Sequence, residues 1–283
     1  MKIIIGAANI GSNYGVNKSG INSISKIKQI FAYIRKNNIN TIDDAISYKR
    51  SKKKLNKVNL ENFKFISKIK LTKNYKSTKD LNYYFYKHVK KSLEEINKKK
   101  YYCILGHNVY KSKSKNLKLI SALKYLKKKK ITDKIGISVY NPEEIKYILK
   151  LWKPQIIQSP LNVFDQRLIN SDIIQYLKKK KIELHVRSIF LQGALVIRKT
   201  PIKLIKFRNE FKIWEKWCKN KKISRLKACL HFIKKFKKIS SVVIGINNLE
   251  QIKEIIKYAK QKTININYSP NIKKIKIIDP RKW

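Results

Sequence analysis

The chain has 283 residues, 43% of them hydrophobic, and a formal net charge of +51 at pH 7. Its length allows a sizeable core, and its apolar content excludes an intrinsically disordered protein. The apolar runs at 3–5 and 242–246 are too short to cross a bilayer, and the first residues lead into no signal-peptide pattern, so we expect a soluble cytoplasmic protein with no membrane partner.

Short apolar runs of strand length recur along the chain, and longer segments with helical spacing lie between them. The expected strands are 2–8, 39–45, 63–69, 101–107, 134–140, 155–162, 183–190 and 241–246. The expected helices are 22–36, 78–99, 115–129, 143–152, 170–180, 204–218, 225–237 and 249–261. Strands that alternate with helices pair in parallel, because each return crossover needs a helix. Eight such units predict an α/β protein, a (β/α)8 TIM barrel in which residues 1–283 form a single domain.

Local chemistry supports the helix at 143–152 in particular. Asn141 suits a helix cap, Pro142 the first helical position, and Glu143 and Glu144 the positive end of the helix dipole. The segment 191–224 has a less regular pattern. We expect it to form a long loop near the barrel mouth followed by a helix.

Polar side chains end three consecutive expected strands, where a barrel of this type carries its reactive groups. Asp43 ends the second strand, Lys68 the third and His107 the fourth, and Tyr48 follows on the loop after Asp43. An ammonium near a phenol lowers its pKa and favours proton donation at neutral pH, while a carboxylate holds the ammonium in place. A neutral imidazole orients or polarises a carbonyl oxygen. The four residues therefore predict a proton-transfer set.

Each of these residues has an ordinary alternative role. Lys68 is one lysine among sixty and Tyr48 one tyrosine among 16, Asp43 suits a turn, and His107 suits a strand end. Their occurrence in order at successive strand ends favours the catalytic interpretation.

With these residues in this order, the chain resembles the aldo/keto reductase family of NAD(P)H-dependent barrel reductases. The resemblance begins with GAANIGSNYGVNKSG, INTIDDAISYKRSKKKL, FISKI and ILGHN, which are similar to the family's glycine-rich opening and the segments that bear its catalytic residues. It continues in the same order through KIGISVYNPEEI, IIQSPLNVFDQRLI, HVRSIFLQGALV, SSVVIGINNLEQIKEI and IIDPRKW. It covers essentially the whole chain and implies NAD(P)H-dependent reduction of an aldehyde or ketone.

The resemblance also implies roles for individual residues. Tyr48 becomes the proton donor to the carbonyl oxygen, Asp43 and Lys68 the pair that tunes it, and His107 the group that orients the substrate. A small carbonyl compound is the expected partner.

On the cofactor side, Ser138 and Gln158 match the positions that hold the nicotinamide carboxamide, and Arg187 falls where many relatives stack an aromatic ring on the nicotinamide. The segment with Gly245, Asn247 and Gln251 matches the one around the cofactor phosphates and ribose. A helix that starts near residue 248 directs free N–H groups at an anion, although the same residues also suit an ordinary capped turn. NADP is the expected cofactor and NAD the alternative.

Three residues depart from the family pattern: Asp44 replaces a Thr, Lys49 a Gly and Lys53 a Glu. An added carboxylate raises the pKa of a nearby phenol and an added ammonium lowers it. The sequence alone therefore does not show whether the departures raise or lower the pKa of Tyr48. A barrel that binds the cofactor without catalysis, as a sensor or scaffold, is therefore the alternative function.

The high charge raises a third function, nucleic-acid binding. The 68 basic residues include eight arginines, and Arg is the residue that base and phosphate recognition favours. The two YLKKKK runs at 125–130 and 176–181 are expected at helix ends before strands, which is the end of the barrel away from the reaction mouth. This distribution predicts weak, salt-sensitive adhesion to polyanions and no specific nucleic-acid partner.

The remaining sequence features bear on metals and on substrate choice. Cys103, Cys218 and Cys229 have no metal-ligand or C-x-x-C spacing, which predicts reduced thiols and no metal site. The loops at 9–14, 109–114 and 191–203 are expected to shape the substrate pocket. Neither the particular carbonyl compound nor the oligomeric state follows from the sequence.

Overall fold

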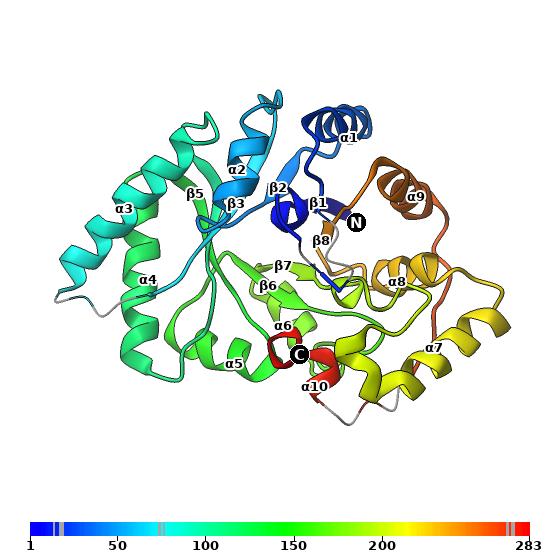
Figure 1. Ribbon diagram of the computed structural model, residues 1–283. Helices are drawn as coiled ribbons and strands as arrows, with labels where there is room; N and C mark the ends of the chain where they lie inside the picture. The colour runs from blue at the N-terminus through cyan, green and yellow to red at the C-terminus, as the bar shows by residue number, and fades with distance from the viewer. Residues whose placement is uncertain (14, 17–19, 73–74, 76, 270–271, 273–274) are drawn as a thin grey trace.

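A closed barrel of eight parallel strands forms the centre of the protein (Figure 1). This computed structural model describes residues 1–283 except 14, 17–19, 73–74, 76, 270–271 and 273–274. The strands are β1 (Lys2–Gly6), β2 (Thr41–Asp43), β3 (Lys64–Ile69), β4 (Tyr101–Gly106), β5 (Thr132–Ser138), β6 (Ile156–Pro160), β7 (Glu183–Arg187) and β8 (Ser241–Gly245). They follow chain order around the barrel and β8 pairs with β1, which confirms the predicted TIM barrel.

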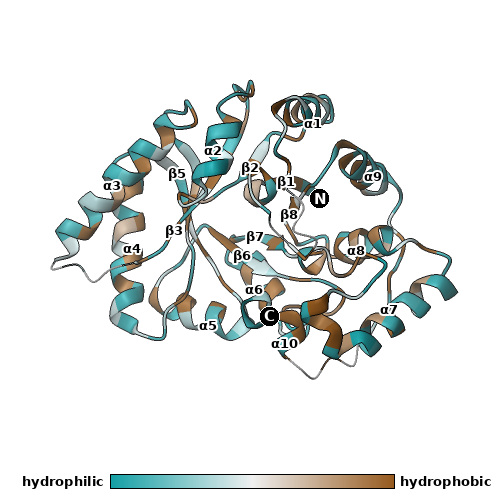
Figure 2. Cartoon of the chain, in the orientation of Figure 1, coloured by the Kyte–Doolittle hydropathy of each residue, from teal (hydrophilic) through white to brown (hydrophobic). Residues whose placement is uncertain are grey.

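Helices surround the barrel, and their polar faces point outward (Figure 2). They are α1 (Ile24–Lys36), α2 (Lys49–Leu55), α3 (Thr78–Glu94), α4 (Lys113–Lys128), α5 (Pro142–Leu151), α6 (Ile173–Lys179), α7 (Arg208–Asn220), α8 (Arg225–Lys234), α9 (Leu249–Lys260) and α10 (Ile275–Ile278). Short 3-10 helices occupy Ala7–Asn9, Leu191–Gly193, Ile202–Phe207 and Pro280–Lys282. No helix within the described ranges is both long and apolar enough to cross a membrane.

The crossover after β2 contains a helix that the periodicity does not predict. The sequence of α2, KRSKKKL, has a single apolar residue, and its buried side chains are Ser51, Lys52 and Leu55. A buried lysine does not register as part of an apolar stripe, so the helical pattern is hidden. The predicted cap of α5 is confirmed, because Asn141 Oδ1 accepts the Glu144 N–H at 2.8 Å with Pro142 in the first turn.

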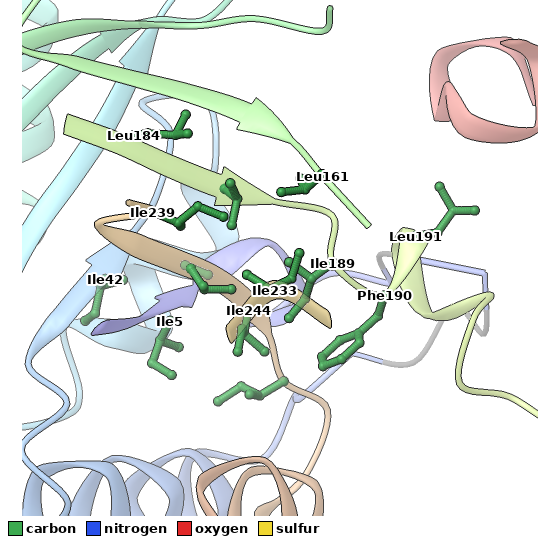
Figure 3. Packing of buried hydrophobic residues seen from close by; sticks show 14 of the residues in the cluster. Ile5, Ile42, Leu161, Leu184, Ile189, Phe190, Leu191, Ile233, Ile239 and Ile244 are labelled. Atoms are coloured by element: carbon green, nitrogen blue, oxygen red, sulfur yellow. The ribbon is translucent and has the colours of Figure 1, made fainter. Parts of the chain in front are cut away.

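The main core lies between the outer face of the barrel and the helices. Ile5, Ile42 and Ile244, on neighbouring strands, belong to it, and Figure 3 shows part of this packing. The three cysteines are free and buried, in agreement with the predicted reduced thiols. Burial of this apolar surface is the main force that holds the helices on the barrel.

The inside of the barrel is layered along its axis. An apolar layer of Ile4, Ile66, Cys103, Leu105 and Ile156 forms a cluster separate from the main core. Alternate residues of a strand point to the same side, and paired positions share a face, so the residues two places further along point inward nearer the carboxyl ends. The apolar layer therefore separates polar side chains at the two ends of the barrel.

The lysine runs lie at the amino-terminal end of the strands, as predicted from their place in the sequence. One run joins α4 to β5 and the other joins α6 to β7. Each run ends on a lysine in the left-handed region, with φ 57° at Lys130 and 56° at Lys181. Their N–H groups return to the carbonyls of Lys127 and Lys178, which closes the preceding helix. These positions usually carry Gly or Asn, because an L side chain is strained there.

Candidate active site

A cavity of about 190 Å³ opens at the carboxyl ends of the strands. All ten residues predicted from the sequence line it: Asp43, Tyr48, Lys68, His107, Ser138, Gln158, Arg187, Gly245, Asn247 and Gln251. They come from seven of the eight strands or from the segments that follow them. The barrel brings these scattered positions together because parallel strands end on one side.

A buried ion pair lies at the base of the cavity. Lys68 Nζ contacts Asp43 Oδ1, and the two residues are 7% and 6% exposed. Gln158 Nε2 donates to the other carboxylate oxygen at 2.8 Å, and Lys68 also donates to the Asp44 carbonyl at 3.3 Å. Asp43 thus has a donor on each oxygen, which fixes the position of the Lys68 ammonium.

His107 follows directly on β4 and its N–H donates to the Ile69 carbonyl at 2.7 Å. Burial, followed by the positive charges of Lys68 and Arg187, lowers the pKa of His107 to about 4. The imidazole is therefore neutral at neutral pH. A neutral ring can donate a hydrogen bond to a carbonyl oxygen without adding charge to the cavity.

Tyr48 reaches the cavity from the turn between β2 and α2. Its N–H donates to the Ala45 carbonyl at 2.9 Å, and its carbonyl accepts the Lys52 N–H at 3.2 Å, so it caps α2. The half-buried side chain lines the same cavity as Lys68 and His107. A phenol, an ammonium, a carboxylate and an imidazole are thus assembled in one place.

The three departures from the family pattern do not line this cavity. Lys49 and Lys53 are exposed on α2, and Asp44 is fully buried on the other side of β2. Burial raises the pKa of Asp44 to about 7, although the positive charge of Lys52 at 3.9 Å and the Ala45 amide oppose the rise. Neither Asp44 oxygen has a hydrogen-bond donor of sound geometry among the described residues.

The other side of the cavity combines the ends of β1 and β8. Asn9 Nδ2 donates to Asn247 Oδ1, and the Asn247 N–H donates to Gln251 Oε1 at 2.8 Å. Asn248 caps α9 by accepting the Gln251 N–H at 2.8 Å. A Cβ at Gly245 would lie 3.4 Å from Asn9 Oδ1, within ordinary van der Waals contact, so Gly245 lies directly beside this pair of amides. The N-terminus of α9 therefore faces a segment held by amide side chains, which suits an anionic group.

Arg187 extends from the end of β7 across the cavity wall. Its Nη2 donates to the Val139 carbonyl at 3.0 Å, and its guanidinium lies 4.3 Å from the centre of the Tyr140 ring. Tyr140 and Asn9 both line the cavity; the sequence analysis did not select Tyr140, and it included Asn9 only as the start of a loop expected to shape the pocket. Each lies within a few residues of a strand end, which is the signal that could have identified them.

Two loops meet over the mouth of the cavity. The Val16 N–H donates to the Gln192 carbonyl at 3.1 Å, and Gly15, with φ 86°, has the same carbonyl close to where a Cβ would be. The loops at 9–14 and 191–203, expected to shape the pocket, contribute Asn9, Gln192, Gly193 and Val196; residue 14 lies outside the described residues. The loop at 109–114 borders a neighbouring hollow, through Tyr110, Ser112 and Ser114.

The barrel and the polar cavity at the carboxyl ends of its strands together have the architecture of a TIM-barrel enzyme. The sequence pattern of the aldo/keto reductase family matches residues 2–277, and the chain belongs to this family. The family match adds that the enzyme is an oxidoreductase of carbonyl compounds. No curated protein is similar enough in sequence to count as a relative. Within the described residues, no group of His, Cys, Asp and Glu side chains is arranged to hold a metal ion.

Two solved structures have the same fold at low sequence identity. The first is an aldo-keto reductase from Bacillus halodurans in its holo form, with 16% identity and a TM-score of 0.75 over 93% of this chain and 88% of that one. The second is the glycerol dehydrogenase from Gluconobacter oxydans, with 16% identity and a TM-score of 0.70 over 93% of this chain and 87% of that one.

Proposed function

We propose that residues 1–283 act as a single NADP-dependent reductase domain that converts an aldehyde or ketone to an alcohol, with Tyr48 as the proton donor. The observation that carries this proposal is the buried contact between Lys68 and Asp43 in the cavity that Tyr48 and His107 also line. Burying a lysine and a carboxylate together costs desolvation energy. A cavity with no catalytic role would have no need for such a pair, so its presence favours a catalytic site.

The proposed proton transfer follows from the charges of these groups. As the carbonyl oxygen becomes negative, the Tyr48 hydroxyl gives it a proton, and the positive charge of Lys68 stabilises the phenolate that remains. Asp43 keeps the ammonium in place through the contact described above. The neutral His107 ring donates a hydrogen bond that orients the carbonyl group.

The residues on the cofactor side fit a nicotinamide dinucleotide. Gln158 Oε1 is buried and has no hydrogen-bond donor among the described residues, although Gln158 Nε2 is bound to Asp43. An amide N–H of the nicotinamide carboxamide would supply that donor, with Ser138 beside it on the next strand. When bound, the cofactor supplies the hydride that the carbonyl carbon accepts.

The rest of the cofactor site follows the same logic. Gly245, Asn247 and Gln251 would contact the phosphates and ribose at the N-terminus of α9, and Arg187 would border the nicotinamide ring. NADP is preferred over NAD because the family commonly uses it and the basic surface suits a 2′-phosphate. The proposed partners are a small carbonyl compound and the cofactor, with no specific nucleic acid.

Tyr48→Phe tests the proposal, with the exposed Tyr176→Phe as a matched control. We expect Tyr48→Phe to lose NADPH oxidation with simple aldehydes, by at least about 100-fold, while its affinity for NADPH stays the same. Tyr176→Phe should match the wild type in both measurements. Affinity is measured by fluorescence titration at about 0.15 M salt, where the Debye length is about 8 Å and general attraction to the basic surface is reduced. Equal turnover by Tyr48→Phe and the wild type would remove Tyr48 from the mechanism.

A cofactor-binding barrel without catalysis is the second candidate function. Arg187 favours it, because a guanidinium occupies the place where the resemblance implies an aromatic ring. The same titration separates the two functions. Tight NADPH binding without turnover over a panel of aldehydes, ketones and sugars would favour the sensor or scaffold.

A further inference from the structure

The positive and negative charges of the side chains that line the cavity do not cancel. The Lys68 ammonium is neutralised by Asp43, and His107 is uncharged at neutral pH because its pKa is about 4. The remaining charged side chain on the cavity wall, within the described residues, is Arg187. The ion pairs of the described residues include none with Arg187, so the cavity has a net positive charge on this wall.

Neutral groups hold the Arg187 guanidinium in place. Nη2 donates to the Val139 carbonyl at 3.0 Å, and Nη1 lies 3.3 Å from Ser188 Oγ. Val139 follows β5, so the side chain crosses from the end of β7 to the end of β5, next to Ser138. A guanidinium has five N–H donors, and these two contacts leave donors available for a ligand.

The nearby carboxylates already have other partners. Asp279 is bound by Arg281, whose guanidinium lies 3.5 Å from the centre of the Tyr140 ring, and Asp165 is bound by Arg167. Glu144 accepts the Tyr140 N–H at 2.6 Å, and Arg187 and Arg281 lower its pKa against the larger effect of burial, which raises it. None of these carboxylates forms an ion pair with Arg187, and Glu144 acts on the guanidinium only through the longer-range attraction between their charges.

We propose that Arg187 recognises a carboxylate on the substrate, so that the substrates are small aldehyde or keto acids. This inference rests on the proposed reductase function. The planar fork of an arginine matches a carboxylate with two parallel hydrogen bonds, and a half-buried guanidinium without an acidic partner is stabilised when an anion joins it. The carbonyl group would then lie at Tyr48 and His107 and the carboxylate toward the ends of β5 and β7.

Succinic semialdehyde and its methyl ester test this proposal, because they differ in charge and share the reacting aldehyde. We expect the wild type to prefer the acid, with a kcat/KM at least about 10-fold higher than for the ester. In Arg187→Met, the acid-to-ester ratio of kcat/KM should fall about 10- to 100-fold, whatever loss the two substrates share. Arg187→Lys should restore part of the ratio, because it keeps the charge but not the fork.

Two controls separate this role from others. Arg208→Met removes one exposed positive charge from α7 and should leave the ratio unchanged. The KM for NADPH, measured with the ester, reports any contact between Arg187 and the cofactor. An unchanged acid-to-ester ratio in Arg187→Met would overturn the proposal, and a higher KM for NADPH together with the unchanged ratio would assign Arg187 to the cofactor.

A binding measurement decides the inference even if turnover is absent. If the wild type reduces neither compound, the proposed function fails, but succinate still probes Arg187. In thermal-shift titrations with saturating NADPH at about 0.15 M salt, succinate should stabilise the wild type and Arg208→Met more than Arg187→Met. Equal stabilisation of all three proteins would mean that succinate binds the basic surface in general, and would refute the proposed site.

Discussion

Substitution of Asp44 by Asn should change how the stability of the protein depends on pH. Asp44 is fully buried, and burial raises its pKa from an ordinary value of 3.8 to about 7. Between these two pH values, the unfolded chain releases this proton while the folded chain keeps it. The free energy of unfolding therefore falls as the pH rises through this range. Above about pH 7, where Asp44 is ionised in both states, it no longer changes because of Asp44.

The size of the effect follows from the same two values. Each pKa unit corresponds to about 1.4 kcal/mol, so the shift to about 7 amounts to about 4 kcal/mol at most. This figure already includes the attraction of Lys52 at 3.9 Å, because that attraction is one of the effects that set the pKa. Asn resembles the protonated carboxyl and does not ionise. Relative to the wild type, Asp44→Asn should thus gain about 2–4 kcal/mol between about pH 4.5 and pH 8.

Urea unfolding of the two proteins at a series of pH values measures this difference directly. The comparison between pH values cancels the constant cost of placing an amide in the site. Asp80→Asn serves as the control, because the exposed Asp80 carboxylate accepts the Ser77 hydroxyl at 2.7 Å in the first turn of α3, and its loss should not stabilise the protein as the pH rises. A difference between Asp44→Asn and the wild type that stays constant with pH would show that Asp44 is already ionised in the folded protein near pH 4.5, and would refute the reasoning.

Three further predictions concern the site and the surface. Lys68→Met should lower kcat/KM for aldehydes by about 100-fold or more, because Asp43 then loses its buried partner and Tyr48 the nearby positive charge; a loss below tenfold would remove Lys68 from the proton-transfer set. The pH profile of kcat/KM should show no step near pH 6.5 from His107, because the pKa of His107 is about 4. A step near pH 6.5 in the wild type that disappears in His107→Gln would show that the ring is protonated below that pH and would contradict this prediction. Lys181→Gly should raise the free energy of unfolding by about 1 kcal/mol, because φ is 56° there and glycine removes the strain. Lys180→Gly, where φ is −80°, should lower the free energy of unfolding. Urea unfolding measures both changes, and the same sign for both would contradict the argument from backbone strain.

The barrel could be predicted because its strands and most of its helices have clear periodicity. The capped start of α5 and the lysine-rich ends of α4 and α6 mark boundaries that the structure confirms closely. Strand lengths were harder to predict: β2 covers Thr41–Asp43, within an expected run of 39–45. After Asp43 the chain still donates to β3 through the Asp44 and Ile46 N–H groups, and it then turns at Tyr48 into α2. An apolar run in the sequence does not show where regular pairing with both neighbouring strands ends.

The candidate site could be located from strand ends, but its internal contacts could not. Sequence order places Asp43 and Lys68 near the ends of successive strands and Gln158 near the end of β6, while their hydrogen bonds depend on side-chain geometry across the barrel. The position of Arg187 against Tyr140 also depends on how a long side chain crosses the ends of neighbouring strands. Likewise, the partner of the buried Asp44 is Lys52, which looks like one more surface lysine in the sequence.

The apolar layer inside the barrel determines how molecules can enter and leave the cavity. Ile4, Ile66, Cys103, Leu105 and Ile156 close the barrel below Asp43 and Lys68, so neither water nor a ligand has a route out through the far end. Molecules that displace one another in the cavity must pass the same opening, beside the hydrogen bond between Val16 and Gln192. Substrate entry, product release and the escape of displaced water therefore share one opening at the carboxyl ends of the strands.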